Sequence, residues 1–234
     1  VENSASTLML PLMPGDWVLN DTIHGGTLQI ATGESLTVAS GTRNSRLDSV
    51  TVVGDIDLVN ATLRLKDVVI DGRVNLPDTI YHGYASLAFE GTQTLGGHAE
   101  IVSTDTGGYY YNTLEMLGEG ELTLGADVRV HGSALNIGAA LTSGAVALQR
   151  LVNLGTIEAD TGTVQVLADD FRNEGIAKAS GGSLNLSSAN ISSGSSGQFH
   201  ISDGTFNLGG TFDTTDFGGF VASGGVVNFN GTVE

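Results

Sequence analysis

The 234-residue chain contains no cysteine. Disulfide bonds, thiolate metal ligands and cysteine nucleophiles are therefore excluded. It also lacks a long hydrophobic run, because residues 8–14 are too short and too broken by proline to form a signal peptide or a membrane span. We expect no membrane insertion of this segment.

Basic residues are scarce. Nine lysines and arginines stand against 26 acidic residues, so the formal net charge is −17. Binding to a nucleic-acid backbone needs clustered basic side chains, and an anionic membrane surface would repel this chain. The composition therefore predicts a solvated exterior and argues against nucleic acid as a partner.

Helical periodicity is missing as well, since glycine or β-branched residues interrupt each apolar pattern within about ten positions. What the chain has instead is 34 glycines, against only 3 prolines, without the Gly-X-Y period of collagen. Glycines separate short runs in which apolar and polar residues alternate, for example residues 27–30, 35–38 and 121–124. This alternation is typical of half-buried β-strands.

An internal repeat organises these strands. Residues 151–167 align with residues 171–187 at an offset of 20, which places Asn153 over Asn173. A period of this length predicts a solenoid. We expect the Asn153–Asn173 column to lie at a turn and to point inward, where an amide can satisfy backbone groups. A second, outward amide ladder continues to the C-terminus at offsets of 20, 22 and 21: Gln165, Asn185, Asn207 and Asn228.

The first half of the chain repeats less strictly. Gly54 and Gly72 are 18 apart, Gly72 and Gly91 are 19 apart, and Leu95 and Leu117 are 22 apart. We therefore expect coils of about 18–22 residues. The predicted organisation is an N-terminal linker or cap over residues 1–15 and a single domain over residues 16–234, with irregular insertions near residues 77–86, 103–113 and 132–146.

Two folds could use such strands. An antiparallel sandwich or barrel also alternates, but like residues would not recur at 18–22 positions, and hairpin dipeptides such as Asn-Gly are few. The repeat favours an all-β, right-handed parallel β-helix, with the handedness following the usual strand twist and crossover preference.

Residues 153–159 (Asn-Leu-Gly-Thr-Ile-Glu-Ala), followed by Gly-Thr-Val-Gln-Val at 162–166, resemble repeats of bacterial exported β-helical proteins, both filamentous-haemagglutinin-like and autotransporter-passenger-like. Residues 47–58 and 89–97 are similar to the same class. The resemblance implies export, an extracellular or cell-surface location, and a role as an adhesin or stalk. It implies no catalytic residues, because its motifs encode coil geometry.

Catalytic chemistry is not expected from the residues either. A β-helical polysaccharide hydrolase needs carboxylates that converge on adjacent coils, and Asp169–Asp170 is the nearest candidate pair. We favour a turn for this pair, because aspartate commonly caps backbone groups there. A carbohydrate-binding or polysaccharide-cleaving β-helix stays as the alternative function.

The sequence gives little indication of a metal site. Asp48, Asp55, Asp57, Asp67 and Asp71 form the densest acidic region, and Ca²⁺ prefers such oxygen ligands. A solvated outer face with nearby basic residues is the preferred interpretation, so no cofactor is expected and Ca²⁺ is the alternative. The five histidines are scattered without zinc-ligand spacing.

The tyrosines are the candidate partner-binding residues. All five fall in two irregular stretches between the expected coils: Tyr81, Tyr84, Tyr109, Tyr110 and Tyr111. Aromatic rings stack on sugars and anchor protein interfaces. The expected partners are a host-cell or matrix glycan or protein, or a second copy that associates end to end, since open strand edges template association. The competing interpretation is that these rings only cover a coil edge.

Overall fold

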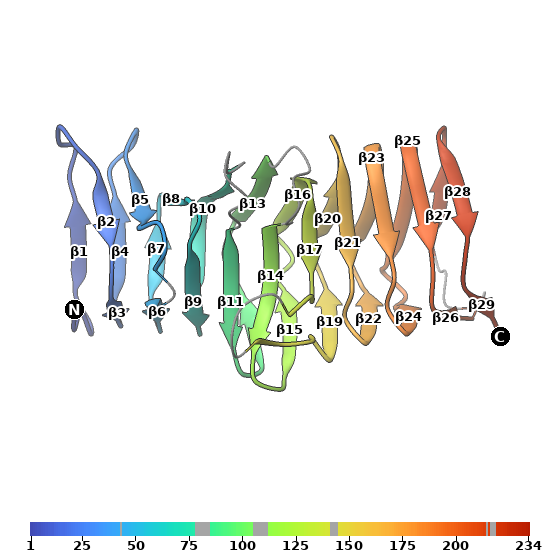
Figure 1. Ribbon diagram of the computed structural model, residues 1–234, viewed down its shortest axis with the longest axis horizontal. Coiled ribbons are helices and arrows are strands. Elements are labelled where there is room, and N and C mark those ends of the chain that lie inside the picture. Colours follow the sequence, from blue (N-terminus) through green and yellow to red (C-terminus); the bar gives the residue numbers. More distant parts are fainter. Residues whose placement is uncertain (43, 78–84, 105–111, 141–144, 214, 216–218) are drawn as a thin grey trace.

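A computed structural model describes the chain except for residues 43, 78–84, 105–111, 141–144, 214 and 216–218. The described residues are all-β without a helix, and their parallel strands stack as a β-solenoid of about nine turns (Figure 1). The N- and C-termini lie at opposite ends of the stack (Figure 1). In the part of the chain described, no helix is long and apolar enough to cross a membrane. The parallel β-helix is confirmed, and its handedness stays a prediction.

Each coil contributes a strand to each of three columns. Column I contains β1 (Thr7–Leu10), β4 (Thr27–Ile30), β7 (Thr51–Val53) and the start of β10 (Val69–Leu76). It continues, after an isolated bridge from Val69 to Gly96, with the following strands: β12 (Gln93–Leu95), β15 (Glu121–Leu124), β19 (Arg150–Asn153), β22 (Asp170–Asn173), β24 (Asn190–Ser193), β26 (Thr211–Phe212) and β29 (Thr232–Val233).

Column II follows column I along the chain. It consists of these strands: β2 (Trp17–Leu19), β5 (Ser35–Val38), β8 (Asp55–Leu58), the end of β10, β13 (Ala99–Thr104), β16 (Arg129–Ser133), β20 (Thr156–Ala159), the starts of β23 (Ile176–Leu186) and β25 (Gln198–Leu208), and β27 (Phe220–Ala222).

Column III closes each coil. It consists of these strands: β3 (Thr22–His24), β6 (Ser45–Asp48), β9 (Thr62–Lys66), β11 (Ser86–Glu90), β14 (Asn112–Leu117), β17 (Leu135–Ile137), β21 (Thr163–Val166), the ends of β23 and β25, and β28 (Val226–Phe229). The short β18 (Ala145–Val146) differs from all of these, because it pairs antiparallel with β14.

Coil length changes along the stack. Leu151 pairs with Phe171 and Phe171 with Ile191, so these coils have the predicted 20 residues. In the middle, Leu95 pairs with Leu124 and Leu122 with Leu151, an offset of 29. The expected stacking of Leu95 over Leu117 is therefore wrong, since a leucine–glycine pair is too common in this chain to specify a register.

Glycine stacking was predicted correctly at only one of two places in the first half. Val53 pairs with Asp71, which sets Gly54 beside Gly72 as expected. A β-carbon on Gly72 would overlap the carbonyl oxygen of Gly54, so the close approach of the coils requires glycine there. Gly72 pairs onward with Ala99 rather than with Gly91, and that prediction is wrong.

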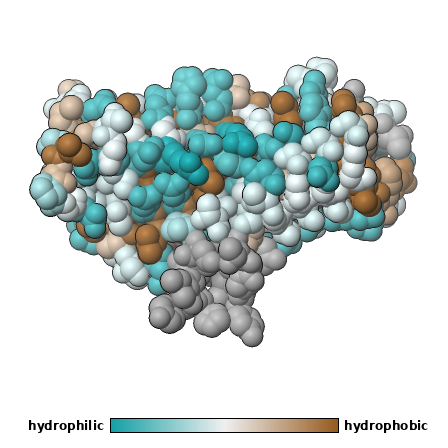
Figure 2. Space-filling view, turned by 90° about the horizontal axis from the view of Figure 1, so that it is seen from above, coloured by the Kyte–Doolittle hydropathy of each residue, from teal (hydrophilic) through white to brown (hydrophobic). Residues whose placement is uncertain are grey.

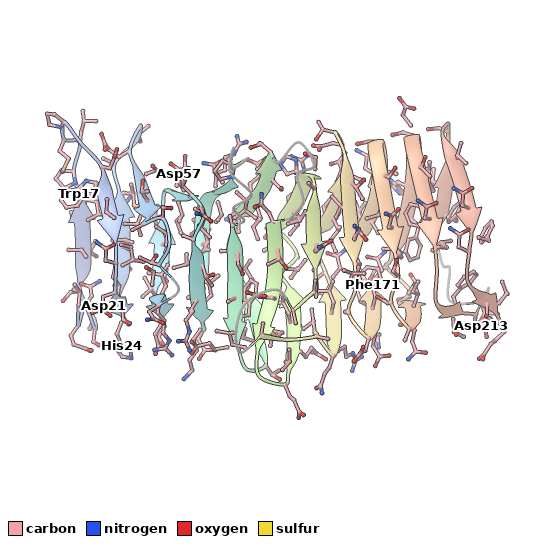
Figure 3. The ribbon with its side chains drawn as sticks, in the orientation of Figure 1. Trp17, Asp21, His24, Asp57, Phe171 and Asp213 are labelled. Atoms are coloured by element: carbon pink, nitrogen blue, oxygen red, sulfur yellow. The ribbon has the colours of Figure 1, made fainter. Side chains whose placement is uncertain are left out.

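The core is a continuous apolar stripe inside the stack. Strands such as β5 and β21 alternate half-buried and buried residues, as the period-2 pattern predicts. Phe89, Phe171, Phe199 and Phe206 are the largest fully buried side chains, and Phe171 lies among the strands in Figure 3. The rings of Phe199 and Phe206 meet edge to face at 5.8 Å.

The expected N-terminal cap and the three expected insertions can be compared with the three strand columns. Thr7–Leu10, which we assigned to a linker or cap, forms β1 and pairs in register with β4. Residues 77–86 and 103–113 lie mostly outside the described residues and separate column II from column III. Within residues 132–146, Leu135–Ile137 is a regular strand in register with β14 and β21.

Candidate functional site

The inward amide ladder joins successive coils at the turn after column I. Asn153 and Asn173 are both fully buried and in register. The Nδ2 of Asn153 donates to Oδ1 of Asn173 at 2.8 Å and to the carbonyl of Ile176 at 3.1 Å. The Nδ2 of Asn173 donates to the carbonyl of Gln198 at 2.9 Å. These contacts agree with the inward position that the repeat predicts for the two amides, and with their expected role of satisfying backbone groups.

Other buried amides act in the same way at coils that the repeat did not reveal. Gln93 donates to the carbonyls of Leu65 and Glu90, each at 3.0 Å. Asn112 donates to the carbonyl of Leu76 at 2.9 Å and accepts from the backbone N–H of Ala85 at 2.8 Å. No sequence signal marks these two amides, because each is followed by a threonine rather than flanked by apolar residues. The long coils also removed the periodicity that would have drawn attention to them.

The outward amide ladder lies on column III. Gln165, Asn185, Asn207 and Asn228 occupy one register position in four successive strands. Asn207 donates through Nδ2 to Oδ1 of Asn185 at 2.6 Å, and Asn228 donates likewise to Asn207 at 2.7 Å. These strands stand side by side at the C-terminal end of the ribbon in Figure 1.

A charged cluster on column II is the densest polar arrangement among the described residues. It joins strands β13, β16, β20 and β23 of four adjacent coils. Its members are Glu100, Arg129, His131, Glu158, Asp160 and Lys178. The ring of His131 lies between Glu100, 3.0 Å from Nε2, and Asp160, 2.7 Å from Nδ1.

Arg129 and Glu158 hold this charged cluster together. Arg129 reaches Glu100 at 3.0 Å and Glu158 at 2.9 Å, and Lys178 reaches Glu158 at 2.9 Å. Burial raises the pKa of Glu158, but hydrogen bonds from Ser180, Lys178 and Arg129 outweigh burial and lower the pKa to about 2. The carboxylate is therefore ionised at neutral pH and is engaged by its partners.

A smaller ionic group occupies column III near the N-terminal end. Glu90 accepts a hydrogen bond from Arg46 at 2.9 Å and forms an ion pair with Arg64 at 2.6 Å. Arg46 also contacts Asp48 at 2.8 Å. The hydrogen bond to Glu90 raises the pKa of the Arg46 guanidinium. Here again the charges on neighbouring coils pair with one another.

The predicted acidic sites are not brought together. Asp169 is exposed at the bend before β22, as expected for a turn, and the exposed Asp170 begins that strand. Asp170 accepts from Asn190 at 2.6 Å. Asp57 accepts from Asn75 at 2.6 Å, and Asp71 contacts His98 at 3.0 Å. Figure 3 shows Asp57 at one edge of the stack and Asp21 and His24 at the opposite edge. Within the described ranges, no three His, Asp or Glu side chains are grouped so that they could hold a metal ion.

The candidate partner-binding residues are the five tyrosines of the chain. Tyr81, Tyr84, Tyr109, Tyr110 and Tyr111 all lie outside the described residues. One buried carboxylate was not among the candidates read from the sequence. Glu115 on β14 is 1% exposed and accepts from the hydroxyl of Ser86 at 2.6 Å.

The surface in Figure 2 carries hydrophilic residues over much of its length, with hydrophobic residues visible near both ends. Among the residues of the last coils, Phe220, Val221, Val226 and Phe229 are 38–64% exposed.

The stacked parallel strands make this chain a β-solenoid repeat protein. Comparison with protein-family models, with curated proteins and with solved structures gave no match.

Proposed function

We propose that this chain is a non-catalytic structural or adhesive segment of a large bacterial surface or secreted protein. It serves as a solenoid stalk or as a fibre-forming unit. The observation that carries this proposal is the unbroken parallel register of column I from β12 to β29. Such a stack gains stability from each coil and each neighbouring interface, which suits an elongated spacer.

The state of the charged groups supports a non-catalytic role. A general acid or base needs a carboxyl group poised to exchange a proton near the working pH. Glu158, the most enclosed carboxylate of the charged cluster, is instead held ionised by Arg129 and Lys178. Pairing of this kind stabilises neighbouring coils without leaving a group free for chemistry.

The exposed apolar residues at the C-terminal end support a fibre-forming variant. Unpaired strand edges next to apolar side chains favour addition of another coil, and a head-to-tail contact between identical chains does not close. A second copy is therefore one proposed partner, and a host-cell or matrix glycan or protein is the other. The extracellular location belongs to the same proposal.

A polysaccharide-cleaving function is the second candidate. The observation that favours it is that three carboxylates, Glu100, Glu158 and Asp160, all lie within 3.5 Å of the Arg129 guanidinium. Such hydrolysis uses carboxylates that converge on one site. Cleavage would leave new reducing ends, so the two candidates make opposite predictions.

The purified chain should be incubated with neutral and acidic polysaccharides and assayed for new reducing ends. The structural proposal predicts no release above that of a heat-denatured sample. Release that disappears in Glu158→Gln would overturn it. Sedimentation velocity over a range of concentrations tests the fibre variant, which predicts open-ended growth rather than a single closed oligomer.

A further inference from the structure

The outward side of column III over the last four coils carries no charge. Its two rows are Thr163, Ser183, Thr205 and Val226, and Gln165, Asn185, Asn207 and Asn228. We call these two rows the amide face. The chain has 26 acidic residues, and none of them lies in these two rows.

The amides of this face keep unused hydrogen-bonding capacity. A carboxamide has two N–H donors and an oxygen with two lone pairs. The bonds from Asn207 to Asn185 and from Asn228 to Asn207 use one donor of each donating amide and one lone pair of each accepting oxygen. The ladder bonds also orient the amide planes, so a ligand would meet donors and acceptors that are already arranged.

A hollow lies at the edge of the amide face. Leu186, Leu208 and Phe229 are in register, so Ser187, Gly209 and Asn230 follow at the same place in three coils. Because Gly209 has no side chain, the surface sinks between Ser187 and Asn230. The hollow measures about 330 Å³ and is lined by Asn185, Leu186, Ser187, Asn207, Gly209 and Asn230.

The lining selects the chemistry of the ligand. It offers amides and a hydroxyl but no charged group, and the net charge of −17 repels polyanions. Successive coils repeat about every 4.8 Å, which is close to the advance of one sugar in an extended linear glycan. A second copy would bury little apolar surface on this face, whereas stable protein interfaces have a largely apolar centre.

We propose that the amide face binds a linear neutral glycan, which runs along the solenoid axis with one sugar ring in the hollow. Hydroxyl groups of the glycan accept from and donate to the free positions of Asn185, Asn207 and Asn230. This proposal deepens the adhesive form of the proposed function and rests on it.

Titration calorimetry of the whole chain with cellohexaose and chitohexaose tests the proposal, with oligogalacturonate as the charged probe. We expect at least one neutral hexaose to bind and oligogalacturonate not to bind. Asn207→Asp removes donors and adds a charge at the centre of the face, and Ser187→Trp fills the hollow. Each should weaken binding about tenfold or more.

Two matched variants serve as controls. Gln29→Glu adds the same charge to column I, and Ser192→Trp adds the same ring to column I of a nearby coil. Both should bind like the unaltered chain. Circular dichroism and the unfolding temperature establish that each variant is folded. If Asn207→Asp does not fold, binding by Ser187→Trp alone tests the proposal.

Several results would overturn the proposal. They are no binding of either neutral hexaose, equal binding of oligogalacturonate, or undiminished binding by both face variants. A dimer in sedimentation that Asn207→Asp disrupts would assign the face to a second copy instead. These outcomes test glycan binding only. The non-catalytic role is tested separately, by the cleavage assay, and only observed glycan cleavage would overturn it.

Discussion

Asn153 donates a 2.8 Å hydrogen bond to the side-chain oxygen of Asn173, one coil further along, and both side chains are fully buried. Asn173 in turn donates to the carbonyl of Gln198 on the next coil. The two amides therefore tie three coils together at the last residues of the column I strands β19 and β22. An unsatisfied buried polar group is costly, so the pair should matter for stability.

Replacement of Asn173 by alanine should lower the free energy of unfolding by about 1–3 kcal/mol, because the amide of Asn153 and the carbonyl of Gln198 both lose a partner. Urea unfolding followed by circular dichroism measures the change. The matched control is Asn228→Ala at the exposed last rung of the outer ladder, which should alter stability by less than about 0.5 kcal/mol. Equal effects would contradict a special role for the inward amides.

Replacement of Gly72 by any larger residue should lower the stability of the fold. The β-carbon of Gly72→Ala would overlap the carbonyl oxygen of Gly54 on the preceding coil, so the coils must separate locally. Overpacking of this kind should destabilise the chain by about 1–3 kcal/mol. In Gly96→Ala the new β-carbon meets only Val69, at an ordinary 3.7 Å, and stability should hardly change. Thermal unfolding of the two variants side by side tests the difference.

The aromatic packing near the C-terminal end gives a third prediction. Phe206 is fully buried and meets Phe199 at 5.8 Å and Phe220 at 6.2 Å. Phe206→Ala should cost about 3–5 kcal/mol through lost burial and a residual cavity. Phe229 is 64% exposed, so Phe229→Ala is the control and should cost far less. Similar losses in guanidinium unfolding would mean that the last coil is covered in solution.

Acid should weaken the charged cluster through Glu158. Its pKa falls from 4.5 in a free chain to about 2 in the fold, so the ionised form stabilises the native state above about pH 4.5. That contribution is lost as the pH drops from about 4.5 towards 2. Glu158→Gln lacks it at every pH. The gap between the unfolding temperatures of the two proteins should therefore narrow over this range, and a constant gap would refute the assignment.

Much of the C-terminal half could be predicted because its coils are nearly equal in length. With offsets of 20 to 22, like residues fall on like, and both amide columns could be read directly from the repeat. The register of the middle coils could not be predicted in this way. Their offset of 29 includes long connections between strands, so similar leucines and glycines align at several false registers.

The sequence by itself determined the strand pattern, the parallel stacking and the inward and outward amide columns, because local alternation and a short period are sufficient to specify them. Only the tertiary structure decided which distant residues meet. Glu100, Arg129 and Glu158 are 29 positions apart in turn and share one cluster because three long coils happen to be in register. The hollow at Gly209 also needs three coils at once. Such sites depend on coil length, which the connections between strands set and the strand pattern does not.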